Sequence, residues 1–281
     1  MSEPRTLPID TQTFEQVRRA GNVYIDKTPY IEKLLRLGRI FFLSRPHRFG
    51  KSLFLSTLQA YFEGKKELFE GLYIADHEEE LAHRLRREPW EGSPVLYFDL
   101  NATNYKSENT LPDLLEEQLE RWETIYGIEQ RPLAPERRFV NLIETLYRQK
   151  GKQVVVLIDE YDKPLLQTMG VNETLNEQYR NTLKAFYSVI KTCDQYIRFA
   201  FLTGVTKFSK VSIFSDLNNL QDISMLNDYA EICGLTQAEI EKTFKPEIER
   251  LAKNTKNSYD KMLEELKKRY DGYKFSVLGE S

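Results

Sequence analysis

One stretch of the chain decides the fold, and it reads Arg45-Pro46-His47-Arg48-Phe49-Gly50-Lys51-Ser52. It stands between an apolar, strand-like run (39–43) and a helix-like run that opens at Leu53. In that setting backbone N–H groups can wrap phosphates, a Lys ammonium can reach the outer phosphates, and a Ser hydroxyl can ligate Mg²⁺. We therefore expect residues 45–53 to bind a nucleotide, with Lys51 on its phosphates and Ser52 on the metal ion.

The loop departs from the usual G-x-x-x-x-G-K-[ST] pattern at its start. Arg45 occupies the first Gly position and Pro46 follows it, so the loop should turn differently there. Gly50 retains the second Gly and lets the backbone come close to a phosphate. Taken alone, Gly-Lys-Ser is a weak pattern, and a surface turn before a helix is the alternative interpretation.

A second motif strengthens this interpretation, and it reads Val154-Val155-Val156-Leu157-Ile158-Asp159-Glu160. A continuous apolar run is typical of a parallel strand that is buried on both faces, with its carboxyl end at a ligand crevice. We expect Asp159 to hold Mg²⁺, because this hard cation prefers oxygen ligands. Glu160 would polarise the water that attacks the γ-phosphate. The alternative is a core strand that ends in a solvated acidic turn.

Composition excludes several other classes of protein. The chain has 281 residues, 41% of them hydrophobic, which is enough for one sizeable core with a smaller appended domain. Its net charge of −3 implies no bulk attraction to nucleic acid or to an anionic membrane. Cys193 and Cys233 form no disulfide framework. Residues 1–5 lack the basic start and apolar core of a signal peptide, and no apolar run approaches about 20 residues, so we expect a cytoplasmic protein without membrane association.

Strand-like and helix-like runs alternate along the chain, which predicts a parallel α/β sheet covered by helices on both faces. A strand with its own helices (94–149) separates the loop helix from the Asp-Glu strand, as in the additional-strand NTPases. The strand 196–203 should then lie between those two strands. Its tip, Thr203-Gly204-Val205-Thr206-Lys207, offers polar groups for the γ-phosphate or the attacking water, with Thr203 as the catalytic candidate. The charged segment 65–87 is predicted to be a solvated helix.

The sequence resembles a predicted AAA-ATPase-like family that often occurs in bacterial proteins with a C-terminal PD-(D/E)XK nuclease-like domain. The resemblance runs nearly end to end and rests on these segments: Tyr24 to Thr28, Ser44 to Leu53, Leu157 to Asp162, Phe201 to Val205, Ser212 to Ser215, Leu217 to Leu220, Cys233 to Thr236, and Tyr270 to Tyr273. It implies binding and hydrolysis of ATP with Mg²⁺, and contact with nucleic acid through the appended domain. The sequence stops at Ser281, before such a domain, so we expect either a piece of a longer protein or a short member of the family.

We expect three parts: a helical lead-in (1–36), a P-loop ATPase core (37–234) and a helical lid (235–281). Thr236 and Glu239 predict a capping box that opens the first lid helix toward Phe244, with further helices at 248–251 and 259–270. A lid of this kind can carry a basic residue that touches the γ-phosphate. The nominal candidates, most of which we expect to be only solvated, are Arg250, Lys267, Lys268 and Arg269.

Four more side chains are candidates for the site. Arg45 and Arg48 flank the loop and should contact phosphate, or pair with Glu160 or Asp162 when nucleotide is absent. Tyr24 could stack on adenine, although ordinary core packing is the favoured interpretation. By analogy with AAA proteins alone, Arg180 would serve a neighbouring subunit as an arginine finger in a homo-oligomer.

Two classes of function remain. The first is an ATPase whose cycle drives a conformational change in an appended effector, and it needs Glu160 to orient water. The second is a nucleotide-gated switch or scaffold that binds ATP or ADP with negligible turnover. A small-molecule kinase is disfavoured, because the Asp-Glu pair suits activation of water and the sequence has no evident motif for an acceptor substrate.

Overall fold

The centre of the protein is a parallel β-sheet. The computed structural model describes residues 6–8, 11, 13–206, 213–214, 217, 219–270 and 275 of the chain. Within these residues the sheet has five strands in the order β2-β3-β4-β1-β5, and every pair of neighbours is parallel. The strands are β1 (Ile40–Ser44), β2 (Val95–Asp99), β3 (Val154–Asp159), β4 (Ile197–Gly204) and β5 (Gln221–Asp222). The parallel α/β fold is therefore confirmed, and β4 lies between β1 and β3 as predicted.

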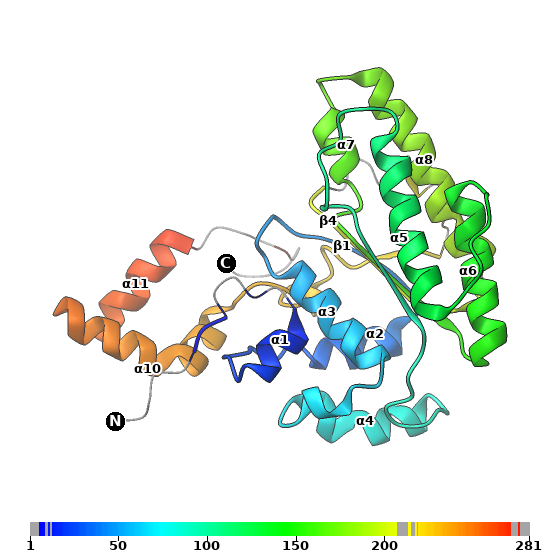
Figure 1. Ribbon diagram of the computed structural model, residues 1–281. Coiled ribbons are helices and arrows are strands. Elements are labelled where there is room, and N and C mark those ends of the chain that lie inside the picture. Colours follow the sequence, from blue (N-terminus) through cyan, green and yellow to red (C-terminus); the bar gives the residue numbers. More distant parts are fainter. Residues whose placement is uncertain are drawn as a thin grey trace.

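Helices cover both faces of the sheet (Figure 1). One face carries α5 (Thr110–Tyr126), α6 (Pro135–Lys150), α7 (Lys163–Thr168) and α8 (Glu173–Thr192). The other face carries α1 (Phe14–Arg19), α2 (Pro29–Leu37), α3 (Lys51–Phe62) and α4 (Tyr73–Arg84). Short 3₁₀ turns complete the connections: Lys66–Phe69, Asp194–Tyr196 and Asn227–Tyr229. This two-sided cover explains the unbroken apolar run of β3, whose six residues are all buried.

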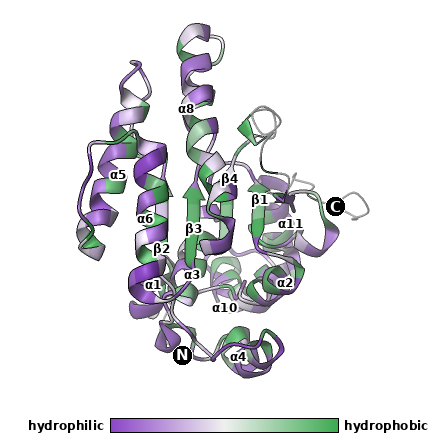
Figure 2. Ribbon diagram, turned by 90° about the vertical axis from the view of Figure 1, so that its right-hand side faces the viewer, coloured by the Kyte–Doolittle hydropathy of each residue, from purple (hydrophilic) through white to green (hydrophobic). Residues whose placement is uncertain are grey.

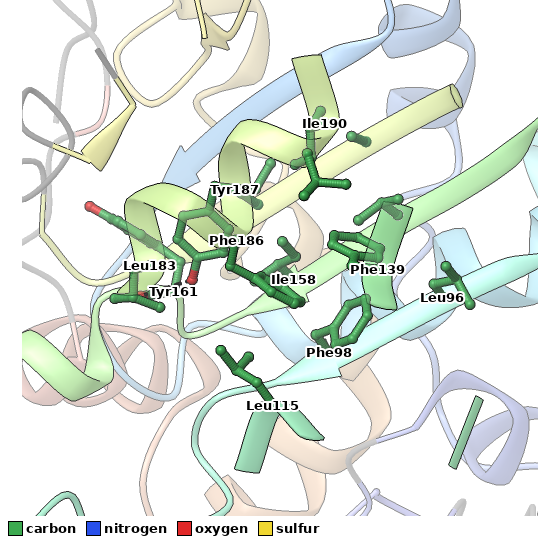
Figure 3. Packing of buried hydrophobic residues seen from close by; sticks show 14 of the residues in the cluster. Leu96, Phe98, Leu115, Phe139, Ile158, Tyr161, Leu183, Phe186, Tyr187 and Ile190 are labelled. Atoms are coloured by element: carbon green, nitrogen blue, oxygen red, sulfur yellow. Dashed lines mark hydrogen bonds between the residues drawn. The ribbon is translucent and has the colours of Figure 1, made fainter. Parts of the chain in front are cut away.

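Alternating side chains of each strand form two hydrophobic clusters. In β1, Ile40 and Phe42 face α5, α6 and α8, whereas Phe41 and Leu43 face the opposite helices. Figure 3 shows the first cluster, in which aromatic rings from β2, α6 and α8 pack together. The ring centroid of Phe139 lies 5.0 Å from that of Phe98 and 4.6 Å from that of Phe186. Each fully buried side chain of this size contributes about 1.5–3 kcal/mol to stability. The strands are correspondingly hydrophobic in Figure 2.

The prediction of a solvated helix over segment 65–87 is confirmed only for the helical state of α4, and the solvation was wrong. The segment forms a 3₁₀ turn and α4 instead of one helix, and its apolar side chains join the core under α3. Leu68, Phe69 and Leu81 are buried there. The high charge of the segment concealed these positions, because most of its acidic and basic groups occupy the opposite side. Glu78 is buried as well, and it accepts hydrogen bonds from the Tyr61 hydroxyl and from Arg87.

The last helices are α10 (Gln237–Thr255) and α11 (Tyr259–Tyr270). They pack on each other through a small cluster of their own around Ile248, Ala252 and Met262, and they lie to one side of the sheet (Figure 1). The capping box is confirmed, since Thr236 Oγ1 accepts from Glu239 N and Glu239 Oε2 accepts from Thr236 N. The helix predicted at 259–270 is confirmed as α11, whereas the separate helix predicted at 248–251 was wrong, because these residues continue α10. The division into three parts stays a prediction.

Two further observations bear on composition. No helix within the described residues is long and apolar enough to cross a membrane. Cys193 and Cys233 are both free and buried. Burial raises the pKa of Cys193 to about 12 and that of Cys233 to about 11, so both thiols are protonated at neutral pH.

Candidate nucleotide site

The loop between β1 and α3 turns through two left-handed residues. Arg48 has φ +64° and Gly50 has φ +86°, after which α3 begins at Lys51. Within the described part of the chain, no hydrogen bond uses the backbone N–H of Arg48, Gly50 or Lys51. These groups surround the amino-terminal end of α3, which carries a partial positive charge. The loop therefore offers several N–H donors and a helix end to an anion, although its first Gly is missing.

Lys51 joins the loop to the carboxyl end of β3. Its side chain is only 3% exposed, and its Nζ lies 3.0 Å from Glu160 Oε1. The same ammonium donates to the carbonyl oxygens of Arg45 (3.0 Å) and Pro46 (3.1 Å). His47 Nδ1 stands 3.8 Å from Glu160 Oε1. The cation that would meet phosphate is thus held by one carboxylate and two loop carbonyls.

Glu160 has an unusual setting. It follows β3 with φ +53°, a left-handed conformation that is uncommon outside glycine. Its Oε2 is buried and has no hydrogen-bond partner among the described residues. Burial raises the pKa of Glu160, and the charge of Lys51 opposes that shift. A buried carboxylate oxygen with free acceptor capacity is able to accept a proton from a bound water.

Asp159 receives hydrogen bonds from three elements. Ser52 Oγ at the start of α3 donates to Oδ2 over 2.5 Å, and Thr203 Oγ1 of β4 donates to Oδ1 over 2.6 Å. The Tyr97 hydroxyl of β2 donates to Oδ2 over 3.2 Å. The carboxylate is 3% exposed, and no cationic side chain of the described residues forms an ion pair with it. Within the described part of the chain, the side-chain partners of this carboxylate are therefore neutral hydroxyl groups.

Sequence analysis missed two residues at this edge, Tyr97 and Asp99. Register pairs Asp99 with Asp159 and Tyr97 with Leu157, so both side chains lie on the face of the sheet that carries Asp159. Burial raises the pKa of Asp99, and the charge of Asp159 adds to the shift. Polar residues at alternate positions before the end of an apolar strand were the available signal. The sequence did not show that β2 is the neighbour of β3, so it could not connect these residues with Asp159.

Arg45 does not form either of the ion pairs expected for it. The residue is 1% exposed, and its guanidinium donates to the carbonyl oxygens of Ser224 (2.8 Å) and Tyr229 (3.0 Å). Its side chain thus turns away from Glu160 toward the segment that follows β5. Arg48 is exposed and forms no ion pair with any described residue, so the pairing expected for it is also absent.

Asp162 fixes the tip of β4 instead of pairing with an arginine. Its carboxylate accepts from Val205 N, Thr206 N and Thr206 Oγ1, at distances between 2.7 and 3.2 Å. A Cβ on Gly204 would stand 2.3 Å from the Tyr161 ring, so this approach requires glycine. The tip is therefore a packed turn that places Thr203 beside Asp159. Lys207, predicted with this tip, lies outside the described residues, as do positions 212, 215, 218 and 271–273 of the resemblance.

The remaining candidates lie elsewhere. Tyr24 packs in the core as favoured, with its ring centroid 5.0 Å from that of Phe14 and its hydroxyl 3.3 Å from Thr57 Oγ1. Arg180 lies on α8, where it pairs with Glu177. The four basic lid candidates are exposed on α10 and α11: Arg250, Lys267, Lys268 and Arg269. Their roles, and that of Arg180 in a neighbouring subunit, stay predictions.

The donor set of the site suits a hard cation. Ser52 and Asp159 supply a hydroxyl and a carboxylate oxygen that lie 2.5 Å apart, and among the described residues the buried carboxylate has no counter-ion. The described residues contain no group of three or more His, Cys, Asp or Glu side chains that could enclose a metal ion. Mg²⁺ can bind to two protein oxygens in this arrangement when a nucleotide supplies further ligands.

Comparison with known proteins identifies the family. Residues 8–214 match the family described as predicted AAA-ATPase. A relative from Azotobacter chroococcum mcd 1, an uncharacterized protein in the vnfD 5' region, is 38% identical over 276 residues. That match covers 97% of this chain and 49% of the relative, so the chain spans about half the length of this curated relative. Because the family match extends over more than half of its residues, the chain belongs to the predicted AAA-ATPase family.

Proposed function

We propose that this protein binds ATP together with Mg²⁺ and hydrolyses it, and that the cycle drives a conformational change in an appended effector. The observation that carries the proposal is the meeting of Ser52, Asp159 and Thr203, which are far apart in sequence, through two short hydrogen bonds at the carboxyl ends of β3 and β4. Ligands of parallel α/β sheets bind at that edge. A core strand that merely ended in a solvated acidic turn would leave its carboxylates exposed, whereas both are buried.

Each residue has a distinct role in the proposed reaction. Lys51 and the loop N–H groups would bind the β- and γ-phosphates, and Ser52 and Asp159 would hold Mg²⁺. The metal ion, once bound, neutralises charge that develops on the phosphates. Glu160 would orient the attacking water and accept its proton, and its unpartnered Oε2 supports that role. Thr203 would keep the Asp159 carboxylate in place through Oδ1.

One observation favours a second function, that of a nucleotide-gated switch with negligible turnover. Lys51 is paired with Glu160, the residue that should activate water. An incoming phosphate would compete with Glu160 for Lys51, so binding alone would rearrange both side chains. A protein that used this rearrangement as its signal would not need hydrolysis. The two functions differ in the rate of ATP hydrolysis, which can be measured.

The decisive experiment compares Glu160→Gln and Lys51→Ala with the wild type. Steady-state phosphate release gives turnover, and calorimetric titration with a non-hydrolysable ATP analogue gives affinity. We expect Glu160→Gln to retain affinity and to lower turnover by a factor of about 10² or more. Lys51→Ala should abolish binding, because the loop loses its phosphate cation. Lys150→Ala, an exposed lysine at the end of α6, is the control and should match the wild type.

The outcomes separate the alternatives. Equal turnover in the wild type and Glu160→Gln would show that Glu160 does not activate water. Tight binding with no turnover in either protein would favour the switch. Wild-type affinity in a folded Lys51→Ala protein would refute the nucleotide site itself. Thermal unfolding of each variant is needed beside the titrations, since Lys51→Ala leaves the buried Glu160 without its cation.

A further inference from the structure

Tyr97 lies one strand away from the motifs that define the site. It is the third residue of β2, and β2 pairs only with β3 among the described strands. Its ring is partly buried and packs with both hydrophobic clusters, while its hydroxyl reaches Asp159 Oδ2 at 3.2 Å. The backbone carbonyl of Tyr97 accepts from Trp122 Nε1 of α5 at 3.0 Å. Strand, ring and hydroxyl are therefore all held in place.

The three donors to Asp159 arrive from different directions. Tyr97 comes from β2 and Thr203 from β4, the two strands that flank β3, and Ser52 comes from α3. Tyr97 and Thr203 donate hydrogen bonds to different oxygens of the carboxylate, which fixes its rotation about the Cβ–Cγ bond. Ser52 shares Oδ2 with Tyr97. If Ser52 turns toward a metal ion, Tyr97 and Thr203 remain to orient the carboxylate.

We propose that Tyr97 is a positioning residue that orients Asp159 toward the bound Mg²⁺ and thereby strengthens the coupling between metal and nucleotide. This inference rests on the proposed function, because it concerns the same site. Residues that hydrogen-bond to a metal-binding side chain set its orientation, and their loss typically lowers metal affinity by about 10–100-fold.

The test is a binding measurement on Tyr97→Phe, which removes the hydroxyl and keeps the ring. The affinity for a non-hydrolysable ATP analogue is measured by calorimetry with Mg²⁺ and again with a chelator. We expect the enhancement by Mg²⁺ to fall about 10-fold, while the affinity in chelator stays within about 2-fold of the wild type. Asp159→Ala should remove the enhancement altogether. Restricting the readout to binding avoids dependence on the turnover rate.

Tyr126→Phe is the matched control. Tyr126 also places its hydroxyl on β2, but at the other end of the strand, against the backbone of Val95. Loss of that contact should leave both affinities unchanged, whatever it does to stability. An unaltered Mg²⁺ enhancement in Tyr97→Phe would overturn the proposal, and so would an equal loss in Tyr126→Phe. If the wild type itself gains nothing from Mg²⁺, the proposed function fails first and the role of Tyr97 fails with it.

Discussion

Arg45 stands where a phosphate-binding loop usually has its first glycine, and the structure shows what the arginine does there. Glycine at that position would leave the start of the loop free to turn, whereas Arg45 anchors it. Its guanidinium donates to the carbonyl oxygens of Ser44, Ser224 and Tyr229, and its backbone N–H donates to Gly204 O. The loop is thus fixed to β4 and to the segment after β5. The sequence indicated a different turn here but gave no reason for an arginine, because Ser224 and Tyr229 are 179 and 184 residues away.

Replacing Arg45 by lysine should destabilise the protein. One ammonium cannot span the carbonyls that the planar guanidinium reaches, so buried acceptors lose their donors. We expect a loss of about 2–4 kcal/mol in the free energy of unfolding, measured by denaturant titration. Arg48→Lys changes an exposed arginine of the same loop and should stay within about 0.5 kcal/mol of the wild type. Equal losses in the two variants would mean that the buried contacts of Arg45 contribute little.

Elements were predictable where their signals are local. The apolar run of β3 and the capping box of α10 follow from residues close together in the chain, and the succession of motifs predicted the place of β4 between β1 and β3. The two-residue strand β5 was not predictable, because two residues carry no periodicity and its pairing with β1 depends on a distant partner. The hydroxyl groups that donate to the Asp159 carboxylate were predictable only in part. Ser52 and Thr203 lie at the ends of recognised motifs, but Tyr97 lies inside a strand whose neighbour the sequence did not reveal.

The capping box gives a prediction for α10. Thr236→Ala removes the oxygen that accepts from Glu239 N, so the first turn of the helix loses one of its partners. We expect α10 to lose about 1 kcal/mol of local stability, seen as faster amide hydrogen exchange in its first turn. The sheet should keep its protection, because α10 and α11 form their own cluster. Thr182→Ala is the control, since its hydroxyl bonds only within α8 and caps nothing. Exchange that accelerates uniformly in sheet and helix would contradict this local effect.

At the scale of the whole molecule, the loop is connected to the helices of the expected lid. Gly234 N donates to Phe49 O at 2.9 Å, and the Phe49 ring lies against Gly234. Lys27 pairs with Glu239 of α10 and donates to Glu231 O. Phe275, which follows α11, places its ring over the Arg45 guanidinium and against Phe49. The loop therefore contacts the chain both before α10 and after α11.

This connection predicts that nucleotide binding is felt at residue 234. Phosphates bound to the loop should restrict the movement of Phe49 and so strengthen the hydrogen bond that its carbonyl accepts from Gly234. We expect the ATP analogue with Mg²⁺ to slow amide exchange of Gly234 by about 3-fold or more. The Gly127 amide, which bonds within the end of α5, should not change. Lys51→Ala should abolish the slowing together with binding. Saturating nucleotide without any change at Gly234 would show that the loop and the α10–α11 pair respond independently, and the effector coupling in the proposed function would then need another route.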